Sequence, residues 1–228
     1  MTIPHYVLSE LGDRVYSSPS LEEINPQSIT PQSSRLALLD RDGVIVVKAP
    51  KSQYHLVPDD IRLLLGVGEA IHIINEEGIP VVVITNQPAV YKGQLSHVGM
   101  VALDTRMQEY LDKHHAHIDA VIYCPHPSGK EKNISLEKIC TCRKPNPGMV
   151  ELALRLYPTS REEVYMFGDF ESDIQLARNA GINPIYVATA HDEFAKMQES
   201  IRQKHPEVFA HAQYPTLLEA VQQTILRR

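Results

Sequence analysis

Two groups of carboxylates stand close behind short apolar runs of the sequence. Asp40 and Asp42 flank a single residue after the run 36–39, and Asp169 follows the run 164–167. Taken singly, either group fits an ordinary turn or helix start, where Asp is a favoured residue. Brought together at strand ends, they would form an oxygen-rich site suited to Mg²⁺. One carboxylate beside that ion could attack phosphorus and form an aspartyl-phosphate, and a second could exchange a proton with the leaving alcohol.

A phosphoryl group held at such a site needs hydrogen-bonding and positively charged partners. Thr85 follows the apolar run 81–84 and offers a hydroxyl, and Lys144 offers a point charge. Phosphoryl transfer depends mainly on positioning and on neutralising the charge of a loose transition state. These residue types therefore indicate phosphate-ester chemistry at the same edge as the carboxylates.

A second set of residues could bind a different metal. Cys124, His126, Cys140 and Cys142 include every cysteine of the chain. Three thiolates and one imidazole form a typical tetrahedral zinc site, and four protein ligands make such a site closed and structural. The alternative is a loop that merely contains buried cysteines. Because Cys142 lies two residues before Lys144, a zinc ion here would fix the loop that carries the lysine.

A rival metal site lies at His114, His115 and His117. We prefer a polar helix end for this segment, because histidine is favourable near the negative end of a helix. No cysteine or acidic partner stands at ligand spacing, so we expect no metal there.

The functional residues need a scaffold that gathers them, and the apolar runs predict one. We expect strands at 36–39, 81–84, 118–123, 164–167 and 184–187, and helical segments at 58–77, 96–115, 149–156, 172–180, 192–204 and 215–226. Alternating strands and helices predict an α/β fold, a Rossmann-like parallel sheet with helices on both faces. In such folds ligands bind beyond the carboxyl ends of the strands, which is where the acids and Thr85 stand.

Composition and charge limit the domain organisation and the function. The chain has 228 residues, 43% of them hydrophobic, which suffices for one substantial core. Residues 1–34 are rich in Ser, Pro and Gln and predict a partly irregular extension, so we place a single domain at 35–228 with a zinc loop at about 124–142.

The remaining exclusions follow from charge and hydropathy. A net charge of −6 disfavours nucleic acid as a partner. No apolar stretch approaches the roughly 20 residues of a membrane helix, and the first residues lack the pattern of a secretory signal. Three cysteines do not form a disulfide framework, so we expect a reducing cytoplasm. We expect a monomer and leave an oligomer open.

Four motifs in order resemble the haloacid dehalogenase (HAD) superfamily of phosphohydrolases; they are 40–43, 84–87, 143–145 and 168–173. The resemblance covers roughly residues 35–190 and implies a HAD-like fold and a Mg²⁺-dependent phosphomonoester hydrolase. It makes Asp40 the nucleophile and Asp42 the general acid/base. Thr85 and Lys144 would stabilise the transferred phosphoryl group. Asp169 would join Asp40 and the backbone carbonyl of Asp42 around Mg²⁺.

Within that superfamily the zinc loop resembles two groups of small phosphatases without a large cap domain. These are the D-glycero-D-manno-heptose 1,7-bisphosphate 7-phosphatases and the histidinol-phosphate phosphatases. Residues 85–93, including Asn86 and Gln87, resemble the substrate loop of the first group, and 140–149 resemble its zinc and lysine segment. The resemblance therefore implies a phosphorylated sugar substrate, with Asn86 and Gln87 as substrate contacts. Arg143 would hold a second phosphate, although a surface ion pair is an alternative role.

Two positions depart from the pattern of the heptose group: Val44 stands where Thr is usual, and Phe170 stands where Lys is usual. Lys48, Lys51 and Lys92 are further candidates for phosphate contacts. We expect removal of the 7-phosphate of heptose 1,7-bisphosphate, with histidinol-phosphate hydrolysis as the alternative. A catalytically silent binding module is a third possibility, which the full set of motif residues opposes.

Overall fold

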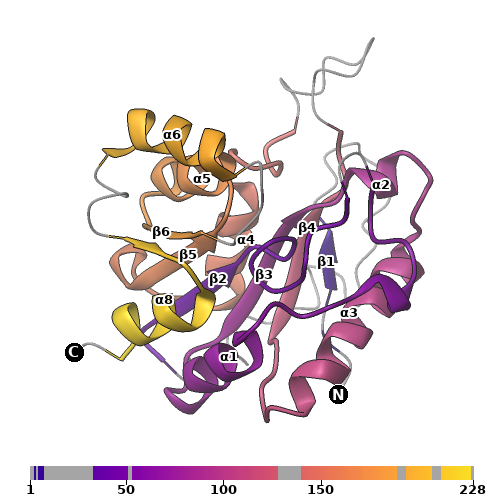
Figure 1. The fold of residues 1–228 in the computed structure, drawn as a ribbon, viewed down its shortest axis with the longest axis horizontal. Helices are drawn as coiled ribbons and strands as arrows, with labels where there is room; N and C mark the ends of the chain where they lie inside the picture. Colours follow the sequence, from indigo (N-terminus) through magenta and orange to yellow (C-terminus); the bar gives the residue numbers. More distant parts are fainter. Residues whose placement is uncertain are drawn as a thin grey trace.

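The computed structural model describes residues 3, 5–7, 33–50, 53–127, 140–188, 194–206 and 212–226. Lys51, residues 128–139 of the expected zinc loop and most of the expected extension therefore lie outside the described residues. The described chain forms a seven-stranded sheet in the order β1-β4-β3-β2-β5-β6-β7, and all its strand pairs are parallel (Figure 1). The strands are β1 His5–Val7, β2 Leu36–Leu39, β3 Val81–Asn86, β4 Ala120–Cys124, β5 Val164–Gly168, β6 Asn183–Val187 and β7 Gln213–Tyr214.

The central strands consist almost entirely of buried apolar residues, as expected for a sheet covered on both faces. In the register, Leu39 at the end of β2 pairs with Val83 on one side and with Phe167 on the other. The carboxyl ends of β2, β3 and β5 therefore lie side by side at one edge of the sheet. This edge is where the sequence places the acidic motifs and Thr85.

Helices cover both faces of the sheet (Figure 1). They are α1 Val67–Glu76, α2 Pro88–Tyr91, α3 His97–Asp112, α4 Gly148–Leu156, α5 Glu171–Ala180, α6 Phe194–Lys204 and α8 Leu217–Thr224, with short 3₁₀ turns at Pro58–Asp60 and Arg161–Glu163. One hydrophobic core packs α1, α3 and α8 against the sheet, and a second packs α4 and α5 against the opposite face. The predicted α/β architecture is confirmed.

The structure differs from the expected elements within 58–77 and in four short elements that were not expected, namely β1, α2, the 3₁₀ turn Arg161–Glu163 and β7. The single helix expected over 58–77 is a 3₁₀ turn followed by α1, because Ile61 is extended and Leu63 bridges to Val46. Gly66 then turns the chain with a positive φ of 77°, which glycine adopts without steric cost. Strands β1 and β7 were not predicted; β1 lies within the expected extension and pairs with β4. Among the described residues, no helix combines the length and the apolar character needed to cross a membrane.

Candidate active site

Two glycines allow the acidic motifs to approach each other closely. Gly43 has a φ of 101°, and a Cβ atom there would overlap with the carboxylate of Asp169. A Cβ atom at Gly168 would overlap with the side chain of Asp173. The loop after β2 and the loop after β5 can therefore bring their carboxylates into one cluster.

Three buried carboxylates meet in this cluster. Oxygen atoms of Asp40, Asp169 and Asp173 lie within 4.8 Å of one another. Lys144 reaches into the group, with its Nζ 2.8 Å from Asp40 Oδ1 and 2.7 Å from Asp173 Oδ1. The same Nζ donates to the backbone carbonyl of Ile84 at 3.1 Å. Burial alone would lower the pKa of Lys144, but the two carboxylates outweigh it and hold that pKa above its usual value. Lys144 is therefore a permanently charged group next to Asp40.

The crowding of negative charge makes the cluster a good site for a divalent cation. Burial, together with the charges of Asp173 and Asp42, raises the pKa of Asp40 to about 6 although Lys144 opposes the rise. Burial, together with Asp40 and Asp173, raises the pKa of Asp169 to about 7 against the opposing charge of Lys48. Asp169 Oδ1 is buried without a hydrogen-bond partner among the described residues. Such hard oxygen donors fit Mg²⁺, so Asp40 and Asp169, with Asp173 beside them, could hold that ion.

Asp42 lies outside the acidic cluster and has its own set of partners. Its Oδ2 accepts hydrogen bonds from Gln87 Nε2 at 2.7 Å and from Arg41 Nη2 at 3.3 Å. Its Oδ1 lies 3.5 Å from His55 Nε2. Burial opposes ionisation of Asp42, but the charges of Arg41 and His55 and these hydrogen bonds lower its pKa. The environments of Asp40 and Asp42 thus shift their pKa values in opposite directions.

The residues at the end of β3 contact Asp42 and the loop that carries Lys144. Gln87 Nε2, which binds Asp42, also lies 2.9 Å from the buried hydroxyl of Thr85. Asn86 instead binds the backbone of Lys144 twice: its Oδ1 accepts from the amide at 3.1 Å and its Nδ2 donates to the carbonyl at 3.4 Å. Gln87 therefore connects Thr85 with Asp42, whereas Asn86 joins β3 to the loop of Lys144. The contacts of Asn86 described here are to the protein, and its expected role as a substrate contact stays a prediction.

The four expected zinc ligands form a compact tetrahedron. The six distances among the three Sγ atoms and His126 Nδ1 are 3.4, 3.7, 3.2, 3.1, 3.3 and 3.2 Å. A regular tetrahedron of that size has its centre about 2 Å from each corner, close to zinc–ligand distances. All three cysteines are buried and free of disulfides. Burial raises the pKa of the Cys124 thiol to about 12, so a bound cation is what would keep that thiol ionised.

Arg143 is attached to this tetrahedron rather than to the acidic cluster. Its Nη1 donates to the carbonyl of His126 at 2.7 Å, and its amide donates to Cys140 Sγ at 3.3 Å. The guanidinium thus braces the loop that delivers Lys144. Its expected contact with a second phosphate stays a prediction.

The fold brings three further residues to the site, and sequence reasoning missed one of them, His55. Asp173 reads as a residue of the first helical turn, and its Oδ2 does accept from the amide of Phe170 at 3.0 Å, yet it also binds Lys144. Lys48 was a candidate for phosphate, and its Nζ lies 2.5 Å from Asp169 Oδ2 and 5.4 Å from the ring centre of Phe170. His55 had no sequence signal, because only the folded loop brings it to Asp42.

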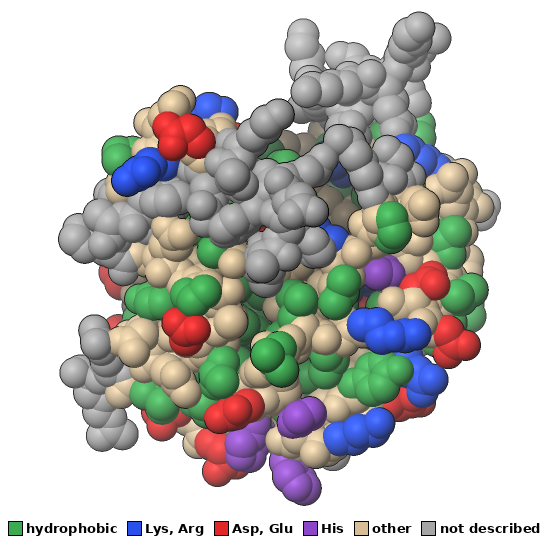
Figure 2. All heavy atoms as spheres, in the orientation of Figure 1, with side chains coloured by type: hydrophobic (Ala, Val, Ile, Leu, Met, Phe, Trp, Pro, Cys, Tyr) green, Lys and Arg blue, Asp and Glu red, His purple; other side chains and the backbone are tan. Residues whose placement is uncertain are grey.

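The expected polar helix end at residues 114–117 has no metal-ligand cluster in the part of the chain that the structure describes. Histidine side chains gather at the lower edge of the face drawn in Figure 2. The rings of His72 and His115 lie 6.5 Å apart between centroids, and His117 lies 3.6 Å from Asp119.

Comparison with known proteins identifies the fold and the family. The HAD-hydrolase-like family model matches residues 141–212. The D-glycero-beta-D-manno-heptose-1,7-bisphosphate 7-phosphatase of Rhodopseudomonas palustris is 35% identical over 147 residues, 64% of this chain and 79% of that protein. The enzyme of the same name from Pseudomonas putida is 29% identical over 70% of this chain and 85% of its own.

A solved structure agrees with these relatives. It is the D,D-heptose 1,7-bisphosphate phosphatase of B. bronchiseptica in complex with magnesium and phosphate, with a TM-score of 0.71 and 27% identity over 85% of this chain and 99% of that one. The chain belongs to the HAD superfamily of phosphatases. The family predicted from the four motifs is thereby confirmed, and the silent binding module is excluded. In this HAD phosphatase, the edge formed by β2, β3 and β5 is the candidate active site.

Proposed function

We propose that this HAD phosphatase removes the 7-phosphate of D-glycero-D-manno-heptose 1,7-bisphosphate through an aspartyl-phosphate on Asp40. The observation that carries the proposal is the buried carboxylate cluster of Asp40, Asp169 and Asp173 around Lys144, with Asp42 held apart by other partners. The relatives named for heptose 1,7-bisphosphate support the choice of substrate.

The groups of the site divide the reaction among them. Asp40 attacks phosphorus, the bond to the C7 oxygen breaks, and Asp42 gives its proton to that oxygen. Asp42 then takes a proton from water, which attacks the phosphoryl group on Asp40 and releases inorganic phosphate. Lys144 and the Thr85 hydroxyl hold the phosphoryl oxygens in line. Mg²⁺ held by Asp40 and Asp169 would neutralise negative charge on those oxygens.

We further propose that Cys124, His126, Cys140 and Cys142 bind a structural Zn²⁺. Their tetrahedral spacing supports a closed site with no open position for substrate. The loop that follows carries Arg143 and Lys144, so the ion would stabilise the position of the lysine and act on catalysis only indirectly.

A parallel turnover assay tests the proposed substrate. Both anomers of heptose 1,7-bisphosphate, fructose 1,6-bisphosphate and histidinol phosphate are compared at equal concentrations with Mg²⁺ present. We expect the highest kcat/KM on one heptose anomer, because the relatives are named for that sugar. Preference for histidinol phosphate would contradict the proposed substrate while leaving the Asp40 chemistry in place.

A further inference from the structure

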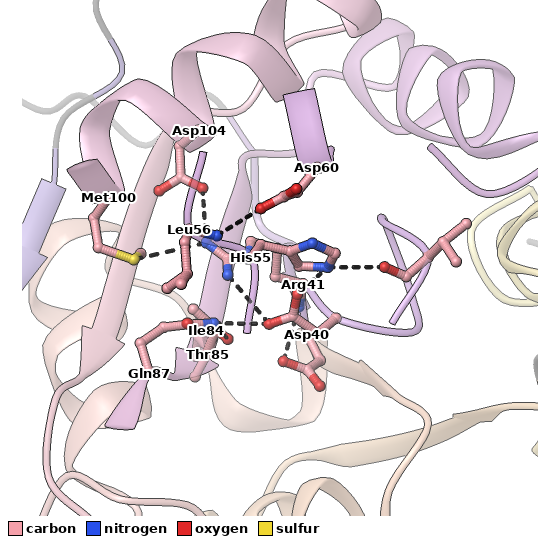
Figure 3. Close-up of polar contacts among 12 residues, drawn as sticks. Asp40, Arg41, His55, Leu56, Asp60, Ile84, Thr85, Gln87, Met100 and Asp104 are labelled. Atoms are coloured by element: carbon pink, nitrogen blue, oxygen red, sulfur yellow. Dashed lines mark hydrogen bonds and ion pairs between the residues drawn. The ribbon is translucent and has the colours of Figure 1, made fainter. Parts of the chain in front are cut away.

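A buried ion pair lies behind the acid/base residue. The side chain of Arg41 is only 1% exposed, and its Nη1 lies 3.2 Å from Asp104 Oδ1 on helix α3, a side chain with no exposed surface. The same Nη1 lies 3.8 Å from the sulfur of Met100, one turn earlier on that helix (Figure 3). Buried ion pairs add little stability, since apolar residues of similar volume are often as good or better. The stability of the core therefore does not account for this pair.

The other end of the guanidinium reaches Asp42. Arg41 Nη2 lies 3.3 Å from Asp42 Oδ2, so one planar group joins the carboxylate on α3 to the carboxylate of the acid/base. The backbone of Arg41 is also fixed, because its carbonyl accepts the amides of Ile45 and Val46 at 3.0 and 2.9 Å. With both the backbone and Nη1 held, the position of Nη2 is determined by the fold.

Two donors of different origin then set the orientation of Asp42. Gln87 Nε2, from the chain after β3, and Arg41 Nη2 both bind Oδ2. The other oxygen, Oδ1, lies 3.5 Å from His55 Nε2, so protein groups lie close to both oxygens of this carboxylate. Removing Asp104 would leave Asp42 as the sole carboxylate partner of the buried guanidinium among the described residues, and Arg41 would then be free to move toward it and turn it.

We propose that Asp104 is a positioning residue for the phosphatase reaction, which acts through Arg41 to hold the carboxylate of Asp42 in place for proton transfer to the leaving oxygen. The proposal rests on the proposed function, in which Asp42 protonates the leaving group. The proposal adds that helix α3, through Asp104, determines the position of Asp42. No other residue of α3 takes part in the reaction described above.

Dependence on the leaving group provides the test. The C7 oxygen of heptose 1,7-bisphosphate is a poor leaving group that needs a proton, whereas nitrophenolate leaves p-nitrophenyl phosphate without one. The variants are Asp104→Ala, Asp104→Asn, Asp42→Asn and the double variant Arg41→Met with Asp104→Leu, whose apolar pair preserves packing. Glu109→Gln is the matched control, because it removes an exposed acid that pairs with Arg106 on the same helix. Folding of each variant is checked by circular dichroism and thermal unfolding.

For Asp104→Ala we expect kcat on the heptose substrate to fall about 10-fold or more, and kcat on the nitrophenyl ester to fall less than about 3-fold, with KM little changed. Asp104→Asn keeps an acceptor for Arg41 and should recover part of the loss. The double variant should fold well and still show the unequal loss. Should Asp104→Ala fail to fold, Asp104→Asn and the double variant decide the outcome.

Two results would overturn the proposal and can be told apart. If Asp42→Asn shows the unequal loss but the Asp104 variants lose activity equally on both esters, or lose none, the positioning role alone is wrong. If Asp42→Asn itself affects both esters equally, the acid role of Asp42 in the proposed function is wrong, and the role of Asp104 fails with it.

Discussion

At the scale of single side chains, the contacts that fix the carboxylate of Asp40 suit its proposed role as the nucleophile. Its Oδ1 is held by Lys144 and by the amide of Arg41 at 2.8 Å, so the carboxylate cannot rotate freely toward solvent. We predict that Asp40→Asn abolishes steady-state hydrolysis and incorporation of phosphate into the protein, because an amide cannot form the acyl phosphate. The matched control is Asp59→Asn, which changes an exposed acid in the 3₁₀ turn. Full turnover by pure Asp40→Asn protein would exclude the nucleophile.

The pKa values of the acidic cluster predict how Mg²⁺ binding depends on pH. The pKa of Asp40 is about 6 and that of Asp169 about 7, both above the ordinary 3.8. At pH values between the ordinary pKa of 3.8 and these raised values, the two carboxyls keep protons in the folded, metal-free protein that they lose in the unfolded chain. The two groups therefore make the free energy of unfolding fall as the pH rises. A divalent cation must displace the same protons.

We therefore expect Mg²⁺ to raise the Tm more at about pH 8 than at about pH 5. Thermal unfolding with and without the ion measures this difference, and Asp169→Asn should largely remove it. An equal rise at both values of pH would show that the ion binds without displacing protons from the cluster.

Arg143 tests the bisphosphate part of the proposal. A guanidinium could hold the remote phosphate, and charge-assisted hydrogen bonds contribute about 1.5–3 kcal/mol each, so Arg143→Ala should lower kcat/KM roughly 10–100-fold on a bisphosphate. The loss should be much smaller on a monophosphate, and Arg155→Ala on the exposed side of α4 is the control. Equal losses of kcat/KM on both substrates would mean that Arg143 mainly supports the loop, through the hydrogen bond from its Nη1 to the His126 carbonyl.

At the scale of elements, the proposed zinc ion would control the position of Lys144 through the loop that follows Cys142. We predict about one Zn per chain in metal-replete protein. Cys142→Ser should lower both the zinc content and kcat, the latter through displacement of Lys144. Thr141→Ser, an exposed neighbour in the same loop, should change neither. Metal analysis and kinetics on the two variants decide the matter, and zinc-free but fully active wild-type protein would contradict the site.

Some of the elements and contacts of the site could be predicted from the sequence, and others could not. The strands that carry the site were predictable, because runs such as 81–84 are apolar on both faces and end at polar residues. Asp40, Thr85 and Asp169 could be placed from the sequence because each lies at or directly after the carboxyl end of such a strand. The contacts of Asp42 with Gln87 and of Arg41 with Asp104 were not predictable, since they join residues 45 and 63 positions apart in the sequence. Strands β1 and β7 are three and two residues long, too short to show a period.

The two cores on opposite faces of the sheet make a prediction for the whole molecule. Leu103 on α3 belongs to one core and Leu152 on α4 to the other, and both are essentially unexposed. If residues 35–228 form a single domain, Leu103→Ala and Leu152→Ala should each lower the free energy of unfolding by about 2–5 kcal/mol. Both should shift one common transition in denaturant, measured with the metal content held constant. Two separate transitions, each sensitive to one variant, would indicate two independent units.

The paired bonds between Asn86 and the backbone of Lys144 have a consequence for protein engineering. These bonds join the end of β3 to the segment that follows Cys142. The two segments should therefore be exchanged together when loops are transferred between relatives. A chimaera that imports residues 85–93 without an amide side chain at position 86 would leave the Lys144 peptide unsupported. Loop transplants that aim to change sugar preference should therefore keep Asn86 or transfer both segments together.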